Sequence, residues 1–401
     1  MKTVAGGITA PQGFRAGGIH CGIKKNEQLD LALVLSEREG PVAALFTTNR
    51  VAAAPVLLGR TYLRRGLGRA IIVNSGNANA CTGSEGLLAA ETMAVTVARH
   101  LDTMPHKVFV GSTGVIGQRL PIERIKAGVP ALLQRVRRSG GLEAARAIMT
   151  TDLRPKQAAV QSRIGGRMVT IGGMVKGSGM IHPNMATMLA YFTTDALITR
   201  QALQQSLRAA VLGSFNAISV DGDTSTNDTV LCLANGMAGN ELIEAGSIGQ
   251  RRFEALLAAI CRTLALKICW DGEGVTKVVK ISVTGAPNPQ AARRVADSIA
   301  TSSLVKTALF GEDANWGRIM AAIGRSGVRI DPSRISLRFD EVVMVKNGQS
   351  LGVQAEHRLS KVFKRKEFTI RVDLRLGRGV SEIWTTDLSL DYVKINASYR
   401  S

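Results

Sequence analysis

The sequence predicts a mixed α/β core followed by a smaller α+β domain. Short apolar runs typical of strands alternate with amphipathic helical patterns through the first half of the chain. The stretch from Thr284 to Arg294 is rich in glycine and proline, which predicts a domain boundary, with a larger domain over 1–285 and a smaller one over 286–401. Beyond it, apolar and polar residues alternate strictly from Phe368 to Leu376, as in a strand with one buried face.

In the larger domain, the first clear elements are strands that end in glycine-containing turns. The run RAIIVNSG, residues 69–76, predicts a strand with a turn at its end. The run HKVFVGSTGVIG, residues 106–117, predicts a strand followed by a Gly-Ser-Thr-Gly loop. Between them, apolar residues three and four positions apart predict an amphipathic helix: Leu87, Ala90, Ala94, Val97 and Leu101.

Two later helices show the same spacing. Thr199 is a suitable N-cap for a helix whose apolar face runs from Leu203 to Val211. A second helix has its apolar face over residues 253–268 and should end at the Asp-Gly pair that follows Trp270. After the domain boundary we expect a helical stretch through Ala308 and then strands.

The C-terminal segment predicts one more strand. Leu388, Leu390 and Tyr392 alternate with polar residues, as the residues of the preceding strand do. A Gly-Arg-Gly connection, Gly377 to Gly379, separates the two runs. We therefore expect the two strands to pair in antiparallel fashion.

Composition limits the classes of function. The 401-residue chain has a formal net charge of +20, but its basic residues are spread out and no known nucleic-acid-binding pattern surrounds them, so we expect no specific nucleic-acid partner. A basic nucleic-acid-binding protein is the alternative class, and DNA retention without catalysis would support it. The N-terminal residues lack the apolar region of a signal peptide, and no run reaches the ~18 apolar residues of a membrane span. We expect a cytoplasmic protein.

Two loop motifs resemble ligand sites but fail on detail. The run GGMVKGSG, residues 172–179, lacks the Gly-Lys-Ser/Thr ending of a phosphate-binding loop. The run DGDTSTND, residues 221–228, has Thr226 where a calcium loop needs glycine and Cys232 where it needs glutamate. The five cysteines form no CxxC pair and the histidines are scattered. We therefore expect no metal and no cofactor, and we interpret 221–228 as a polar turn that can brace an active site.

The passage KGSGMIHPNMATML, residues 176–189, places Thr187 after a small residue and a turn-rich approach. A threonine hydroxyl is a weak nucleophile unless a base lies beside it, and its own α-amine can be that base once the threonine is a chain terminus. Attack of the hydroxyl on the carbonyl of Ala186 would create this terminus. From the residues alone, a threonine that simply enters a buried strand is the far commoner case.

This passage closely resembles the self-cleavage segment of the ornithine acetyltransferases, also called bifunctional arginine-biosynthesis glutamate N-acetyltransferases. Other blocks of the chain resemble those of the family, in the same order and over residues 9–401: TAPQGFRAGGIHCGIK, VNSGNANACTG, VGSTGVIG, IMTTD, FNAISVDGDTSTNDT, DGEGVTK, GEDANWGRI and KINASYRS. Any one block could be chance, whereas the ordered set is specific.

The resemblance implies a fold, a processing step and a reaction. It implies a four-layer αββα core and cleavage between Ala186 and Thr187, giving an α fragment 1–186 and a β fragment 187–401 that stay associated, as an α2β2 heterotetramer. The reaction it implies moves acetyl from N-acetylornithine to glutamate through an acetylated Thr187. Some members also accept acetyl-CoA, and the sequence leaves that second activity open. An amidase or aminopeptidase using the same terminal threonine is the alternative.

The resemblance also assigns site residues. Thr187 matches the nucleophile, and Thr113 and Gly114 match the oxyanion hole. The positions that match substrate contacts are Thr150, Lys176, Thr187, Glu273, Asn396 and Ser401, with neighbouring Thr151 as an alternative to Thr150. A lysine suits the α-carboxylate that both substrates carry, and a glutamate suits a substrate ammonium group.

The chain departs from the family pattern at three positions near these blocks. Val275 follows DGEG where alanine is usual, and Ser401 replaces a frequent threonine while keeping the hydroxyl. Trp270 stands where we expect a smaller or charged residue. We expect Trp270 to lie near the substrate site and to affect fine specificity.

Overall fold

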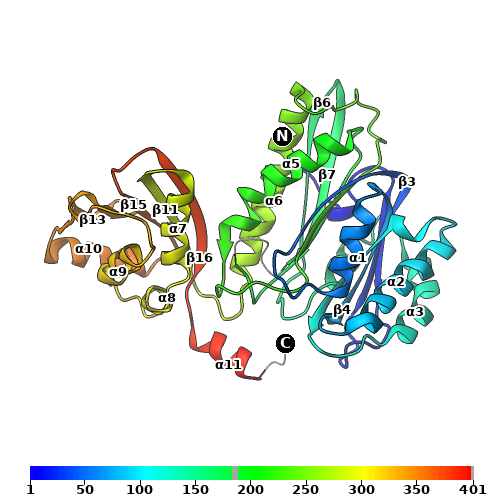
Figure 1. The fold of residues 1–401 in the computed structure, drawn as a ribbon, viewed down its shortest axis with the longest axis horizontal. Helices are drawn as coiled ribbons and strands as arrows, with labels where there is room; N and C mark the ends of the chain where they lie inside the picture. Colours follow the sequence, from blue (N-terminus) through cyan, green and yellow to red (C-terminus); the bar gives the residue numbers. More distant parts are fainter. Residues whose placement is uncertain (183–187, 399–401) are drawn as a thin grey trace.

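The computed structural model describes residues 1–182 and 188–398 and contains two β-sheets (Figure 1). Nine strands of the described ranges form the first sheet, in the order β1-β6-β7-β8-β10-β3-β4-β5, with β2 paired to β3. Their bounds are β1 Lys2–Thr3, β2 Phe14–Ile19, β3 Leu31–Phe46, β4 Leu67–Asn77, β5 Val108–Val115, β6 Lys156–Ile164, β7 Arg167–Lys176, β8 Leu189–Thr194 and β10 Thr229–Ala234.

The long strand β3 divides this sheet into two halves. Its first residues pair with β2 and β4, and its last residues, 42–46, pair with β10. The register shifts between Leu35 and Gly40, as at a β-bulge that bends a strand. The halves pack face to face, because a Cβ built on Gly111 of β5 would lie 1.9 Å from the hydroxyl of Tyr191 on β8.

Helices cover both outer faces. On one side lie α1 Ala54–Leu63, α2 Gly83–His100 and α3 Ile122–Arg135, and on the other lie α5 Arg200–Leu212 and α6 Ile248–Trp270 (Figure 1). The short helix α4, Gly141–Ala147, packs on β2 and β3. The expected four-layer αββα core is confirmed.

The helical patterns in the sequence locate these helices well. The face of α6 from Phe253 to Ile268 is buried, and Thr199 caps α5 by accepting a hydrogen bond from the N–H of Ala202 at 3.2 Å. In α2, Ala90, Ala94 and Val97 are buried as expected, but Leu87 is 40% exposed. The buried face of α2 is displaced from the predicted one, because Gly86, Ala89, Met93 and Ala98 are buried as well.

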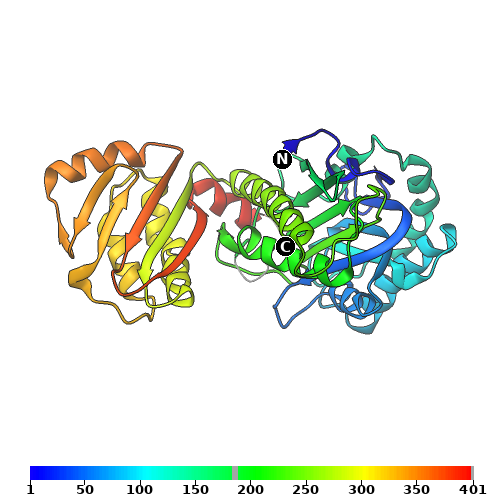
Figure 2. The same cartoon turned by 90° about the horizontal axis from the view of Figure 1, so that it is seen from above.

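Apart from the short strand β9, the strands of the second sheet come from the C-terminal part of the chain, and helices cover one face of this sheet (Figure 2). Its order is β14-β13-β12-β15-β11-β16-β9, with bounds β9 Ile218–Ser219, β11 Val278–Ala286, β12 Ser336–Phe339, β13 Val342–Lys346, β14 Gln349–Ser350, β15 Glu367–Asp373 and β16 Gly379–Thr386. The helices of this part are α7 Pro289–Ala300, α8 Ser303–Phe310, α9 Trp316–Gly324 and α10 Val353–Phe363.

Strand β11 lies on the N-terminal side of the boundary proposed from the sequence, yet it pairs with β15 and β16. The breaker-rich stretch from Thr284 to Arg294 therefore joins β11 to α7 inside the second sheet and its helices. Glycine and proline end a strand and begin a helix there, which is the local role of these residues.

The prediction of an antiparallel pair at the C-terminus was wrong in two respects. Strand β11 separates β15 from β16, pairing parallel with the first and antiparallel with the second. The run from Leu388 to Tyr392 begins helix α11, Leu390–Ser398. Ser389 accepts a hydrogen bond from the N–H of Tyr392 at 3.1 Å, so a serine cap and an acidic first turn outweigh the short apolar alternation.

Candidate active site

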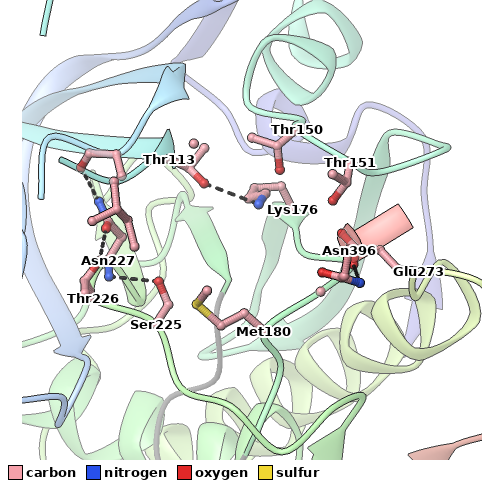
Figure 3. A pocket seen from close by; sticks show the side chains of 14 residues that line it. Thr113, Thr150, Thr151, Lys176, Met180, Ser225, Thr226, Asn227, Glu273 and Asn396 are labelled. Carbon is pink, nitrogen blue, oxygen red and sulfur yellow. Dashed lines mark hydrogen bonds between the residues drawn. The ribbon is translucent and has the colours of Figure 1, made fainter. Parts of the chain in front are cut away.

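One cavity of about 90 Å³ collects residues from distant parts of the chain (Figure 3). The ends of β5 and β7, the loops after α4 and α6, the loop before β10 and helix α11 all contribute to it. Its lining residues are Ala78, Thr113, Gly114, Ile116, Thr150, Thr151, Lys176, Gly179, Met180, Ser225, Thr226, Asn227, Glu273 and Asn396. A cavity of this size has room for several water molecules or for part of a small polar ligand.

Thr113 and Gly114 stand at the end of β5, where its pairing with β4 becomes irregular. Gly114 has φ 133°, and a Cβ there would lie 2.3 Å from the carbonyl carbon of Gly76, so only glycine fits. The side-chain amide of Asn227, in the loop before β10, donates hydrogen bonds to the carbonyls of Ala78 and Ser112 at 2.6 and 2.8 Å. These bonds hold this edge of the cavity in place. The hydroxyl of Thr113 therefore has a defined place on the cavity wall.

Lys176 ends β7 with its side chain buried. Its ammonium donates to the hydroxyl of Thr113 at 3.3 Å. Burial lowers the pKa of Lys176, and the carboxylates of Asp152, Glu273 and Asp228 oppose that effect without cancelling it. Among the described residues, Thr113 is the hydrogen-bond partner of Lys176, whose side chain lines the cavity as a carboxylate-binding group should.

A buried ion network supports the wall that carries Thr150. Lys156 contacts Asp152 and Asp271, each at 2.5 Å, and all three are nearly inaccessible to solvent. Asp152 also accepts the N–H groups of Thr150 and Gly177 at 3.0 and 2.8 Å. Burial raises the pKa of Asp152, but the two lysine charges outweigh it and bring the value to about 2. The charged carboxylate therefore ties two segments of the cavity wall together.

Glu273 and Asn396 close the opposite side. The Asn396 amide donates to Oε2 of Glu273 at 2.8 Å, and the Glu273 N–H donates to the carbonyl of Ser178 at 3.2 Å. A Cβ on Gly179 would lie 2.5 Å from that same Oε2, so glycine at 179 makes room for the carboxylate. Asn396 projects from α11, the element for which the sequence predicted a strand. The cavity thus carries a cation on one side and an anion on the other.

The structure brings together Thr113, Gly114, Thr150, Lys176, Glu273 and Asn396, all of which we singled out from the sequence. Thr151 also lines the cavity, so both threonine alternatives stay open. The assignments to Ala186, Thr187 and Ser401 lie outside the described residues. The nearest described neighbour is Met188, which is buried, and Leu189 next to it pairs with Lys176 in the sheet.

Sequence reasoning missed several lining residues and the supporting network. Ser225, Thr226 and Asn227 belong to the run that we interpreted as a polar turn, and its density of small polar residues was the available signal. Lys156 carried no such signal, because a lysine in an alternating strand normally points to solvent.

Trp270, which we expect from the sequence to affect fine specificity, does not itself line the cavity. It is 43% exposed at the end of α6 and borders a separate surface depression with Arg154, Lys267 and Lys366.

The described residues, 1–182 and 188–398, contain no helix long and apolar enough to cross a membrane. They also hold no group of three His, Cys, Asp or Glu side chains placed to bind a metal ion.

Comparison with known proteins places the chain in a family. A family model described as the ArgJ family matches residues 15–401. The arginine biosynthesis bifunctional protein ArgJ of Geobacter sulfurreducens is 50% identical over 390 residues, 97% of this chain and 99% of the relative. The protein of the same description from Symbiobacterium thermophilum is 49% identical over 403 residues, the full length of both.

Two solved structures are similar in sequence over about half of this chain. The crystal structure of arginine biosynthesis bifunctional protein ArgJ from Bacillus halodurans is 42% identical, covers 52% of this chain and 97% of its own, and has a TM-score of 0.49. Ornithine acetyltransferase complexed with ornithine from Mycobacterium tuberculosis is also 42% identical, covers 47% and 99%, and has a TM-score of 0.43. The match to the family model and the full-length relatives show that this chain belongs to the ArgJ family.

Proposed function

We propose that this chain transfers an acetyl group from N-acetylornithine to glutamate through an acetyl ester on Thr187. The observation that carries the proposal is one small cavity that holds a hydroxyl donor, a buried cation and a buried carboxylate, contributed by Thr113, Lys176 and Glu273. Relatives that share about half of their residues with this chain are arginine-biosynthesis proteins, which supports the same pathway here.

The reaction begins with self-cleavage between Ala186 and Thr187, which frees the α-amine of Thr187. That amine takes the hydroxyl proton while the oxygen attacks the acetyl carbonyl of N-acetylornithine. The hydroxyl of Thr113 and the N–H of Gly114 stabilise the oxyanion, each worth roughly 3–4 kcal/mol in such sites. The C–N bond then breaks, the proton passes to the leaving amine, and ornithine departs.

The second half reverses these steps with a different amine. The neutral α-amine of glutamate attacks the acetyl ester, Thr187 regains its proton, and N-acetylglutamate leaves. Lys176 pairs with the α-carboxylate of either substrate, and Glu273 pairs with the ammonium group of ornithine. Asn396 holds Glu273 in place, and Thr150 or Thr151 adds a hydroxyl contact. Ser401 is the proposed C-terminal substrate contact.

We extend the proposal to the assembly and its place in the cell. Fragments 1–186 and 187–401 stay associated after cleavage, because β7 and β8 pair side by side on either side of the cut. Two such pairs form an α2β2 heterotetramer. The substrates are free amino acids and their acetyl derivatives, and we propose that the enzyme works in the cytoplasm.

Intact-mass spectrometry of the purified chain, followed by incubation with isotope-labelled N-acetylornithine and glutamate, tests the proposal. We expect two fragments and labelled N-acetylglutamate. A Thr187→Ala variant should remain one chain and transfer nothing, whereas Thr96→Ala, a threonine on α2 away from the cavity, should behave as wild type. Uncleaved wild type with full activity would contradict the terminal-threonine mechanism.

Two further arms of the same assay define the reaction. Labelled acetate in place of N-acetylglutamate would identify an amidase that passes the acyl group to water. Acetyl-CoA supplied as the only donor separates an enzyme with one activity from one with two, since only the second would then form N-acetylglutamate.

A further inference from the structure

The proposed mechanism lacks a base for its first event. Before cleavage, the nitrogen of Thr187 is part of the amide bond to Ala186, and its lone pair is delocalised into the carbonyl. This nitrogen cannot accept the hydroxyl proton until the bond has been cut. Self-cleavage therefore needs a proton acceptor from elsewhere in the fold.

The run from Asp221 to Asp228 contacts both flanks of the segment that contains the cleavage site. On the N-terminal flank, the Asp221 carboxylate accepts the N–H groups of Met180 and Ile181 at 2.5 and 2.8 Å. On the C-terminal flank, Oδ1 of Asp228 accepts the N–H of Met188 at 3.0 Å. The polar run singled out in the sequence thus holds the chain on both sides of residues 183–187.

Asp228 is unusual among the carboxylates of this protein. Its side chain is fully buried, and its second oxygen, Oδ2, has no hydrogen-bond partner within residues 1–182 and 188–398. An unpartnered oxygen on a buried carboxylate is costly, because nothing replaces the water that it lost. Such a group calls for an explanation, and a catalytic role is one that buried polar groups are known to serve.

Asp228 also binds the backbone directly after Thr187. Met188 N is bonded covalently to the carbonyl carbon of Thr187, and Asp228 accepts the N–H of this nitrogen. Burial raises the pKa of Asp228 well above its ordinary 3.8. The Met188 and Ser225 N–H groups, the Lys176 charge and the Thr47 hydroxyl oppose that rise. A carboxylate with a raised pKa is a stronger base at neutral pH than an ordinary aspartate.

We propose that Asp228 positions the cleavage segment through Met188 and accepts the Thr187 hydroxyl proton during self-cleavage. This inference rests on the proposed function and supplies its missing step. The proton moves from Thr187 Oγ1 to Asp228 Oδ2 as Oγ1 bonds to the carbonyl carbon of Ala186. The C–N bond breaks, and Asp228 returns the proton to the leaving nitrogen. Water then hydrolyses the ester, which leaves a carboxylate on Ala186 and a free hydroxyl and α-amine on Thr187.

The test follows self-cleavage itself, by intact-mass time courses of full-length chains made by cell-free synthesis. Asp228→Asn keeps the volume and an oxygen for the Met188 N–H but removes the basic carboxylate. We expect its cleavage to be at least about 100-fold slower, the usual lower limit for loss of a general base. Asp195→Asn is the matched control, because Asp195 is also a buried carboxylate that accepts backbone N–H groups, from Gln12 and Thr170, away from the cavity.

Two readouts separate proton transfer from a purely structural role. In the Asp228→Ala variant, added formate should restore part of the cleavage rate, because it supplies a small carboxylate to the emptied space. In the wild type, the rate should increase with pH through a pKa above 3.8, since only the ionised carboxylate accepts a proton. Asp228→Asn should lose this dependence.

The outcomes also separate this inference from the proposed function. Wild-type cleavage rates in folded Asp228→Asn, together with loss of cleavage in Lys176→Met, would transfer the role to Lys176 and overturn the inference alone. An uncleaved but active wild type would overturn the proposed function as well. Slow cleavage in Asp228→Asn with normal cleavage in Lys176→Met supports Asp228.

Discussion

At the residue scale, Thr113 carries the clearest prediction about the chemistry. Its hydroxyl lies on the cavity wall within hydrogen-bond distance of the Lys176 ammonium. We expect Thr113→Val to lower kcat about 100- to 1000-fold, with little change in KM, because the lost hydrogen bond forms fully only in the transition state. Steady-state kinetics of acetyl transfer measure this, and Thr113→Ser, which keeps the hydroxyl, is the control. Equal loss in both variants would contradict an oxyanion role.

Lys156 carries the corresponding prediction about stability. Its ammonium lies between Asp152 and Asp271, with 2% of its side chain exposed. Lys156→Met should destabilise the fold by about 3–5 kcal/mol, because it removes the ammonium that pairs directly with two buried carboxylates. Urea unfolding gives this difference. Lys394→Met removes the highly exposed pair with Asp391 and should cost less than about 1 kcal/mol. Similar values for both variants would refute the importance of burial.

At the element scale, strands β5 and β8 contact each other between the two halves of the first sheet. Tyr191 of β8 is buried, and its hydroxyl has no hydrogen-bond partner among the described residues. We expect Tyr191→Phe to stabilise the protein by about 1–3 kcal/mol, since it removes a polar atom that burial left unpaired. Thermal or chemical unfolding at neutral pH would show the gain. A clear loss of stability would mean that the hydroxyl has a partner in solution.

The same contact predicts non-additive behaviour. Gly111→Ala should cost about 1–3 kcal/mol, because the new methyl would lie 1.9 Å from the Tyr191 hydroxyl. In the Tyr191→Phe background that cost should fall, since the clashing atom is gone. A double-mutant cycle measures this difference in cost. Strict additivity would show that the two halves of the sheet are not in steric contact at Gly111 and Tyr191.

Helix α8 contributes a buried ammonium that makes stability depend on pH. Burial lowers the pKa of Lys306 from 10.5 to about 8, with Asp221, Asp387 and Cys269 opposing. The unfolded chain then binds this proton more tightly than the folded one, so stability should rise between pH 8 and 10.5, by about 3 kcal/mol at most. Below pH 8 the penalty is fully present. Lys306→Met should flatten the rise in urea-unfolding free energy, and an unchanged slope would exclude Lys306 as its source.

At the scale of the whole molecule, the net charge of +20 should oppose the compact state through self-repulsion. Raising NaCl from about 20 to about 200 mM shortens the Debye length to below the size of a domain. We expect Tm to increase by at least about 2 °C, the shift that roughly 1 kcal/mol gives in a domain of this size. Potassium chloride at equal ionic strength should act alike. A lower Tm in salt would show that favourable ion pairs outweigh the repulsion.

How far the sequence predicts this protein depends on how local each feature is. Helices α5 and α6 were predictable because their apolar spacing and N-caps lie within one stretch of chain. The ordered blocks also identified six of the cavity residues. The run from Leu388 to Tyr392 was misread because three alternating residues fit a strand as well as the first turn of a helix.

The sequence by itself determined the amphipathic helices, the αββα class implied by the family blocks, and the residue types that the site needs. Only the tertiary structure decided that β11 belongs to the second sheet, that β3 serves both halves of the first, and that Lys156 and Asp228 are buried beside the cavity. The reason is physical. Periodicity reports the environment of one element, whereas strand partners and the burial of a charge depend on contacts between residues far apart in the chain.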